Sequence, residues 1–214
     1  MQKKRGLSPI FYYSAAGFAV ANVRFGSGIL LKLAVRQPQL PARAERQKQM
    51  KIFGFAGWSG SGKTTLIEQV IPRLVRAGLK VSLIKHAHHR FDVDHPGKDS
   101  FRHRAAGCSE VLVTSGERWA LMHEMRDEPE APLEGQIARM SPCDLLLIEG
   151  YKYYPLPKLE IYREANGKPL LYPEDEHIVA LATDTPVQCH LPQFGLEDYD
   201  AIVAFVLDTV ELNR

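Results

Sequence analysis

This chain of 214 residues has only three cysteines, no long apolar run and no repeats. These features argue against a disulfide-rich protein, a membrane-spanning protein and a repeat protein, respectively. The three cysteines, Cys108, Cys143 and Cys189, form no CxxC pair, so we expect buried apolar residues rather than metal ligands or disulfide partners. This usage fits a reducing cytoplasm. No apolar run approaches the roughly 18 residues that span a bilayer. No internal repeat or low-complexity tract is present.

What the chain does contain is a complete phosphate-loop motif, GWSGSGKT, at residues 57–64. It lies between an apolar stretch, residues 51–56, that predicts a strand and a segment, residues 64–76, whose apolar residues recur at helical spacing. Glycines at positions 57, 60 and 62 permit positive φ and a close backbone approach, so N–H groups and a helix N-terminus can converge on a phosphate. The motif therefore predicts a nucleoside triphosphate site.

The motif assigns roles to individual residues. The residues expected to bind the nucleotide are Gly57, Ser59, Gly60, Ser61, Gly62, Lys63, Thr64 and Thr65. Lys63 bridges the β- and γ-phosphates and is given a catalytic role, and the Thr64 hydroxyl reaches Mg²⁺. Glu149 ends an apolar run, DLLLI, at the carboxyl end of a predicted strand, where it can hold a Mg²⁺ water or orient the attacking water. We assign it catalytic and metal roles; a solvated strand-end acid is the alternative.

From residue 51 onward predicted strands and helices alternate, which favours an α/β fold of the P-loop NTPase type, a mostly parallel sheet with helices on both faces. The predicted strands cover residues 51–56, 79–84, 111–114, 119–123, 144–148, 159–163 and 178–182. The predicted helices cover residues 64–76 and 196–212, with a short helix that ends at Gly107. Residues 124–135 are acidic and contain proline, which predicts a surface linker.

A polar loop rich in histidine and aspartate, residues 85–100, follows the second predicted strand at the edge where ligands bind in this architecture. We assign Asp94 a catalytic or Mg²⁺ role, because a loop that closes over the γ-phosphate needs carboxylates facing the metal. The histidines can instead bind Zn²⁺ or Ni²⁺, although their spacing matches no closed zinc site. A hydrated polar loop is the other interpretation, so the histidines receive no role.

The turn ATDTP, residues 182–186, ends another predicted strand. The Asp184 carboxylate can accept hydrogen bonds from both N1–H and N2–H of guanine, a pattern that adenine does not present. Aspartate before a proline turn is common, so this signal alone is weak. We nevertheless include Asp184 among the nucleotide-binding residues.

Acidic residues are nearly absent from residues 1–49, which hold nine Lys or Arg and one acid, Glu45, against 18 basic and 24 acidic residues in the remainder. A secretory signal or a transit peptide has this composition. Export would, however, separate a nucleotide-binding fold from GTP and ATP, and a transit peptide requires a eukaryotic source. We favour a native protein that begins at Met50. Residues 1–49 would then be a basic N-terminal extension that results from an over-extended start, that is, a start assigned too early, and residues 50–214 form a P-loop GTP-binding domain. If translated, the extension should be mostly disordered or loosely helical.

Six motifs occur along residues 50–214 in a recognisable order: GWSGSGKTTL, IKHAHH, DVDHPGKDS, RWALMHE, LLLIEGYK and ATDTP. Together they resemble the molybdopterin-guanine dinucleotide biosynthesis adapter family, MobB. The resemblance implies a GTP-binding cytoplasmic homodimer with weak GTPase activity and GTP and Mg²⁺ as ligands. It implies as partners the guanylyltransferase that attaches GMP to molybdopterin, and molybdopterin-bearing proteins; we expect neither nucleic acid nor a membrane. Trp58 replaces the lysine with which related folds reach across a dimer, which argues against activation of that type.

Two other functions stay open at this stage. A metal-delivery GTPase for nickel enzymes is favoured by the histidines but lacks a Cys-Pro-His or histidine-rich tail motif. A small-molecule kinase would need an arginine-rich lid, for which Arg102, Arg104 and Arg118 are available, but the linker at residues 124–135 is acidic.

Overall fold

The computed structural model of the chain describes residues 11–13, 18–25, 29–36, 50–87 and 91–212. The chain divides into two compact units, Met1–Glu45 and Arg46–Arg214. The division falls close to the boundary between residues 49 and 50 that the charge distribution suggests. Among the described residues, no helix combines the length and the apolar character needed to cross a membrane.

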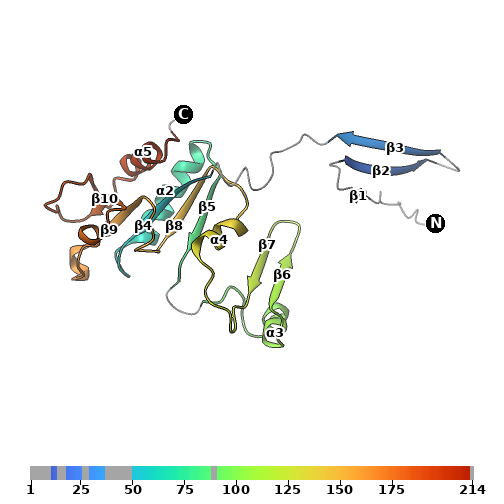
Figure 1. Cartoon of the computed structure of the whole chain (residues 1–214), viewed down its shortest axis with the longest axis horizontal. Coiled ribbons are helices and arrows are strands. Elements are labelled where there is room, and N and C mark those ends of the chain that lie inside the picture. The colour runs from blue at the N-terminus through green and yellow to red at the C-terminus, as the bar shows by residue number, and fades with distance from the viewer. Residues whose placement is uncertain (1–10, 14–17, 26–28, 37–49, 88–90, 213–214) are drawn as a thin grey trace, which may run out of the picture. The chain divides into compact units, whose positions relative to one another are not determined.

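The larger unit is built on a six-stranded sheet in which every neighbouring pair is parallel (Figure 1). The strand order is β11-β10-β9-β4-β8-β5. The strands are β4 (Lys51–Ala56), β5 (Val81–Lys85), β8 (Leu145–Glu149), β9 (Lys158–Tyr162), β10 (Ile178–Thr183) and β11 (Gln193–Gly195). All five residues of β8 are buried, as expected for a central strand of a parallel sheet that is covered on both faces.

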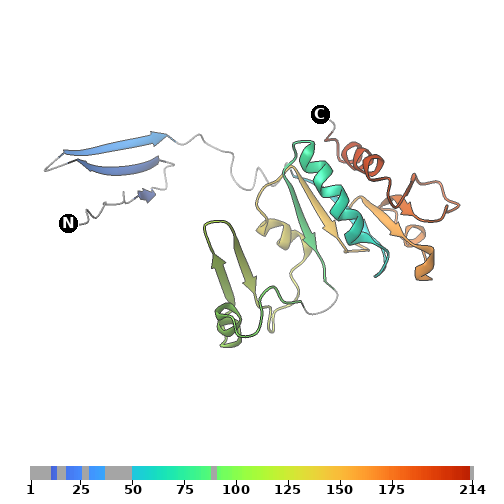
Figure 2. The same cartoon turned by 180° about the vertical axis from the view of Figure 1, so that it is seen from behind.

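Helices cover both faces of this sheet, as predicted, and Figures 1 and 2 show the two faces in turn. On one face α2 (Lys63–Arg76) and α5 (Tyr199–Thr209) pack beside each other on a cluster of buried side chains that includes Phe55 of β4. On the other face α4 (Leu133–Arg139) packs on a second cluster that includes Leu146 of β8. The α/β class predicted from the alternation of elements is therefore confirmed.

The remaining elements of this unit lie outside the six-stranded sheet. A separate two-stranded antiparallel hairpin consists of β6 (Glu110–Thr114) and β7 (Trp119–His123), and α3 (Asp99–Ala105) packs against β6. Two short 3₁₀ turns, η1 (Glu164–Asn166) and η2 (Tyr172–Glu174), follow β9.

Two predictions about this unit are only partly correct. The region predicted as a surface linker contains the start of α4, because Leu133 is an apolar anchor that is only 1% exposed. Burial of the cysteines was also overestimated: all three are free, Cys108 is exposed, and Cys143 and Cys189 are only partly buried. Cys108 follows a short helix whose described residues include none that is buried, so it has no core to enter.

The smaller unit contains a three-stranded antiparallel sheet of β1 (Phe11–Tyr13), β2 (Phe18–Phe25) and β3 (Ile29–Arg36). Disorder or loose helix is the prediction from the sequence for these residues, and the structure differs from it. The strands have a local cause. β2 contains two Phe and two Val residues, β3 consists mainly of aliphatic residues, and the Gly-Ser-Gly between them is typical of a hairpin. Whether the native protein begins at Met50 stays a prediction.

A chain that starts at Met50 is expected to melt at the same temperature and to bind GTP as tightly as the full chain. The physical reason is that Met50 keeps its buried side chain, 7% exposed, at the edge of a unit with its own core. Thermal melts and GTP titrations of both chains are the measurement. A large drop in melting temperature would show that residues 1–49 belong to the fold.

Candidate functional site

The phosphate-loop motif forms a tight turn between β4 and α2. Gly57, Gly60 and Gly62 have φ of 143°, 81° and 94°, the positive values that the sequence predicts. At Gly57 glycine is also required sterically, because an added Cβ would lie 2.4 Å from the backbone oxygen of Ile161. Gly62 is the N-cap of α2, so the first N–H groups of the helix follow the loop directly. Such a helix N-terminus favours an anion.

Lys63, the first residue of α2, lies against this loop. Its Nζ donates hydrogen bonds to the backbone oxygens of Gly57, at 3.0 Å, and of Trp58, at 2.8 Å. Desolvation by partial burial lowers the pKa of this ammonium, and the nearby Glu149 carboxylate opposes that effect. The positive charge of Lys63 is thus held beside the backbone that the motif predicts to surround a phosphate.

Three side chains from three elements meet beside the first turn of α2. The Thr64 hydroxyl donates to Glu149 Oε1 at 2.8 Å. Lys85 Nζ lies 3.1 Å from Thr64 Oγ1 and 3.0 Å from the same Glu149 oxygen. Lys85 and Glu149 are neighbours in the register of β5 and β8, which places both at the carboxyl ends of their strands. The Glu149 side chain is only 6% exposed, so it is not the solvated acid of the alternative interpretation.

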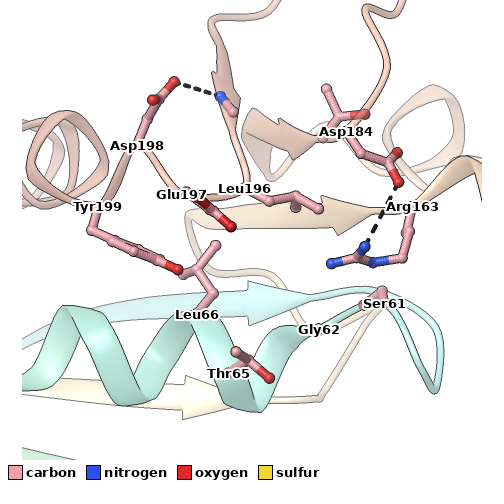
Figure 3. Close-up of a pocket in the computed structure, with 12 residues that line it drawn as sticks. Ser61, Gly62, Thr65, Leu66, Arg163, Asp184, Leu196, Glu197, Asp198 and Tyr199 are labelled. Carbon is pink, nitrogen blue, oxygen red and sulfur yellow. Dashed lines mark hydrogen bonds and ion pairs between the residues drawn. The ribbon is translucent and has the colours of Figure 1, made fainter.

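A cavity of about 420 Å³ lies beside the loop, and Figure 3 shows the side chains around it. The predicted residues Ser61, Gly62 and Thr65 line it together with Asp184, which follows β10. A further wall comes from residues 195–199, which connect the end of β11 to the first residue of α5 and are not among the residues predicted for the site. The structure therefore brings the loop and the predicted base-binding carboxylate to one cavity.

Arg163 is a cavity residue that the sequence analysis missed. Its Nη2 would lie 3.5 Å from a Cβ added to Gly62, and its Nη1 lies 3.9 Å from Asp184 Oδ2 (Figure 3). Asp184 Oδ1 accepts a hydrogen bond from the backbone N–H of Glu164 at 3.0 Å. Arg163 follows β9 and Asp184 follows β10, so the parallel pairing of these strands brings them together. Only the strand order could have revealed this.

The segment after β9 also supports the loop from outside. Asn166 Nδ2 donates to the backbone oxygen of Ser59 at 3.3 Å, and Trp58 Nε1 donates to the backbone oxygen of Pro169 at 2.7 Å. The ammonium of Lys152 lies 3.9 Å from the centre of the Trp58 ring. Trp58 therefore anchors the loop to the body of the protein.

Asp94 is bound by an arginine of α3. Arg104 Nη2 donates to Asp94 Oδ1 at 2.5 Å, and the same guanidinium also pairs with Asp92, at 2.9 Å, and with Glu124. The hydrogen bond from Arg104 lowers the pKa of the Asp94 carboxyl, although burial opposes this. These contacts connect Asp94 to α3 and to the end of β7. Its proposed catalytic role stays a prediction without geometric support.

The histidine loop is described only in part, because His88 and His89 lie outside the described residues. His86 Nε2 lies 3.0 Å from Glu130 Oε1, and its ring centre lies 4.8 Å from that of Tyr151. Within the described ranges, no three His, Cys, Asp or Glu side chains form a group that could hold a metal ion. The described part of the loop therefore offers no support for a Zn²⁺ or Ni²⁺ site.

The all-parallel main sheet, the glycine turn before α2 and the buried acid at the end of β8 define an α/β protein with a fold of the P-loop NTPase type. The family model of molybdopterin guanine dinucleotide synthesis protein B, MobB, matches residues 52–184. The chain belongs to the MobB family, which confirms the resemblance seen in its motifs.

Relatives and solved structures agree with this assignment. The molybdopterin-guanine dinucleotide biosynthesis adapter protein of Escherichia coli (strain K12) is 40% identical over 75% of this chain and 93% of its own length. The protein of the same name from Haemophilus influenzae is 43% identical over 74% of this chain and 88% of its own length. A crystal structure of molybdopterin-guanine biosynthesis protein B covers 75% of this chain and 99% of its own, with 25% identity and a TM-score of 0.60. That of Bacillus subtilis MobB covers 75% and 98%, with 25% identity and a TM-score of 0.58.

Proposed function

We propose that this chain is a GTP-binding adapter with weak GTPase activity that acts in the cytoplasm in the biosynthesis of molybdopterin guanine dinucleotide. The family and the names of the curated relatives support the pathway. One observation supports the binding of GTP: residues of the phosphate loop and Asp184, which are far apart in the sequence, line the same cavity. The loop provides N–H groups for phosphates, and the carboxylate provides an acceptor for guanine N1–H and N2–H.

We propose Mg²⁺ as the accompanying ion. The residues present fit it, because the Thr64 hydroxyl and the Glu149 carboxylate are oxygen donors of the kind that Mg²⁺ prefers and lie 2.8 Å apart. When bound, the ion would neutralise charge on the phosphates. Thr64 would hold it, Glu149 would hold one of its waters or orient the attacking water, and Lys63 would contact the β- and γ-phosphate oxygens.

We further propose a homodimer that acts with the guanylyltransferase and with molybdopterin-bearing proteins. The β6–β7 hairpin supports a protein contact, because Leu112, Val113, Trp119 and Leu121 are 47–65% exposed and belong to both of its faces. A two-stranded hairpin is marginally stable by itself, and exposed apolar patches mark interaction sites. A single-chain mass in sedimentation would contradict the dimer, and failure to retain the guanylyltransferase in a pull-down would contradict the adapter role.

Calorimetric titration of the full chain with GTP and with ATP, with Mg²⁺ and with or without Ni²⁺, tests the nucleotide assignment. We expect GTP to bind more tightly than ATP, because Asp184 is the proposed base contact. We expect Ni²⁺ to change nothing, because no three His, Cys, Asp or Glu side chains gather into a possible metal site among the described residues. A requirement for Ni²⁺ would favour the metal-delivery GTPase. A preference for ATP would favour the kinase, although Arg104, one candidate for its lid, is already paired with three carboxylates.

A further inference from the structure

The Lys85 ammonium takes no part in the function proposed above, yet it lies at the centre of the candidate metal site. It is 3.1 Å from Thr64 Oγ1 and 3.0 Å from Glu149 Oε1, the two oxygens proposed to serve Mg²⁺. The Glu149 side chain is 6% exposed, whereas that of Lys85 is 51% exposed. A lysine from the end of β5 thus reaches in from the solvent side and neutralises a buried carboxylate.

The position of this ammonium decides whether Thr64 Oγ1 and Glu149 Oε1 can bind a metal ion. A Mg²⁺ ion binds oxygen ligands at roughly 2.0–2.1 Å and keeps several waters, so it needs the space next to both oxygens. The Lys85 Nζ contacts both oxygens at about 3 Å and occupies that space. Two cations at one carboxylate repel each other, so the ammonium and the metal ion cannot both hold this position.

We propose that Lys85 is an internal counter-ion that holds the Mg²⁺ position in the nucleotide-free protein and leaves it when Mg²⁺ and nucleotide bind. This rests on the proposed function. Lys85 is therefore a positioning residue: its ammonium holds the Glu149 carboxylate beside Thr64 until the metal arrives, and it sets how much Mg²⁺ is needed.

The surrounding backbone restricts the displacement to the side chain. Lys85 is paired with Glu149 in the parallel register, and the next N–H, that of His86, donates to the Glu149 backbone oxygen at 2.9 Å. Both backbones are thereby fixed at the site. The long and half-exposed Lys85 side chain can rotate to solvent by changing its χ angles, which needs no movement of the strand.

Lys85→Met is the decisive variant, since it keeps an unbranched side chain of similar length and removes the charge. At a fixed saturating GTP concentration, the full chain is titrated with Mg²⁺ and the half-saturating Mg²⁺ concentration is read from the fluorescence of a labelled GTP. If the ammonium blocks the site in about nine of ten molecules, the variant needs about tenfold less Mg²⁺. Without nucleotide or Mg²⁺ it should melt at a lower temperature, because the buried Glu149 loses the cation that contacts it directly.

Lys80→Met is the matched control, because it also removes a positive charge, but from a lysine just before β5, at the opposite end of that strand, whose Nζ donates to the Pro142 carbonyl at 2.7 Å. Its Mg²⁺ requirement should stay within about twofold of the parent chain, a shift that is small on the 1.4 kcal/mol scale of a tenfold change. Lys85→Gln, which keeps a hydrogen-bond donor without the charge, repeats the test if the methionine variant folds poorly.

Three results would overturn the proposal. An unchanged Mg²⁺ requirement in both Lys85 variants would show that the ammonium does not compete with the ion. Weaker GTP binding at saturating Mg²⁺ would make Lys85 a phosphate ligand that remains in the loaded site. Absence of GTP binding in the parent chain, which is measured first, would overturn the proposed function and this inference together.

Discussion

Replacing Lys63 by alanine is expected to abolish tight GTP binding and to leave the fold intact. The ammonium would make charge-assisted hydrogen bonds to two phosphates, each contributing roughly 1.5–3 kcal/mol. Loss of both should weaken binding by roughly two to four orders of magnitude, since about 1.4 kcal/mol corresponds to a factor of ten. The apolar residues through which α2 enters the core, such as Leu66 and Val70, are unchanged, so the helix stays packed on the sheet.

Calorimetric titration with GTP, together with circular dichroism, is the measurement, and Lys80→Ala is its matched control. Lys80 Nζ also donates to a loop carbonyl, that of Pro142, at 2.7 Å. Lys80 precedes β5, however, so it lies at the opposite end of the sheet from the phosphate loop. The control should bind GTP like the parent chain. Unchanged GTP affinity in a folded Lys63→Ala variant would show that this loop does not bind the phosphates.

Sequence prediction succeeded where the cause of the structure is local. The predicted strand at residues 51–56 coincides with β4, and the predicted helix at residues 64–76 differs from α2 by one residue. The reason is that glycine spacing, apolar periodicity and the loop between them all lie within one stretch of chain. Glu149 was found in the same way, because a run of apolar residues marks the buried strand that carries it to the site.

Residues brought to the site by strand order were not predictable in this way. Arg163 and Asn166 follow β9. No local sequence pattern predicts that β9 lies between β4 and β10 in the sheet. The wall at residues 195–199 follows β11, a strand of only three residues, too short for a period-two pattern to show. The pairing of Asp94 with Arg104 likewise depends on how the loop after β5 folds back on α3. The sequence thus predicted the loop residues and Asp184, which line one cavity, but not Arg163 or residues 195–199, which line it as well.

Replacing Asp184 by asparagine is expected to weaken the binding of GTP and to strengthen the binding of XTP. In the structure Asp184 Oδ1 already accepts the Glu164 N–H at 3.0 Å, a bond that an asparagine oxygen can keep, so the turn should survive. The amide nitrogen then replaces the second carboxylate oxygen and faces the guanine N–H donors. Losing the charge-assisted bond at that oxygen should cost roughly 1.5–3 kcal/mol. GTP affinity should therefore fall about tenfold to a hundredfold.

The same variant should bind XTP more tightly than the parent chain does, because xanthine carries a carbonyl where guanine carries its amino group, and the asparagine amide can donate to it. Titration of both nucleotides checks the two changes together. Glu197→Gln is the matched control, because it removes a carboxylate charge from the same cavity but leaves the turn after β10 unchanged. It should leave the ratio of GTP affinity to XTP affinity unchanged. If Asp184→Asn weakens both nucleotides equally, Asp184 only shapes the turn; if neither changes, the base is recognised elsewhere in the chain.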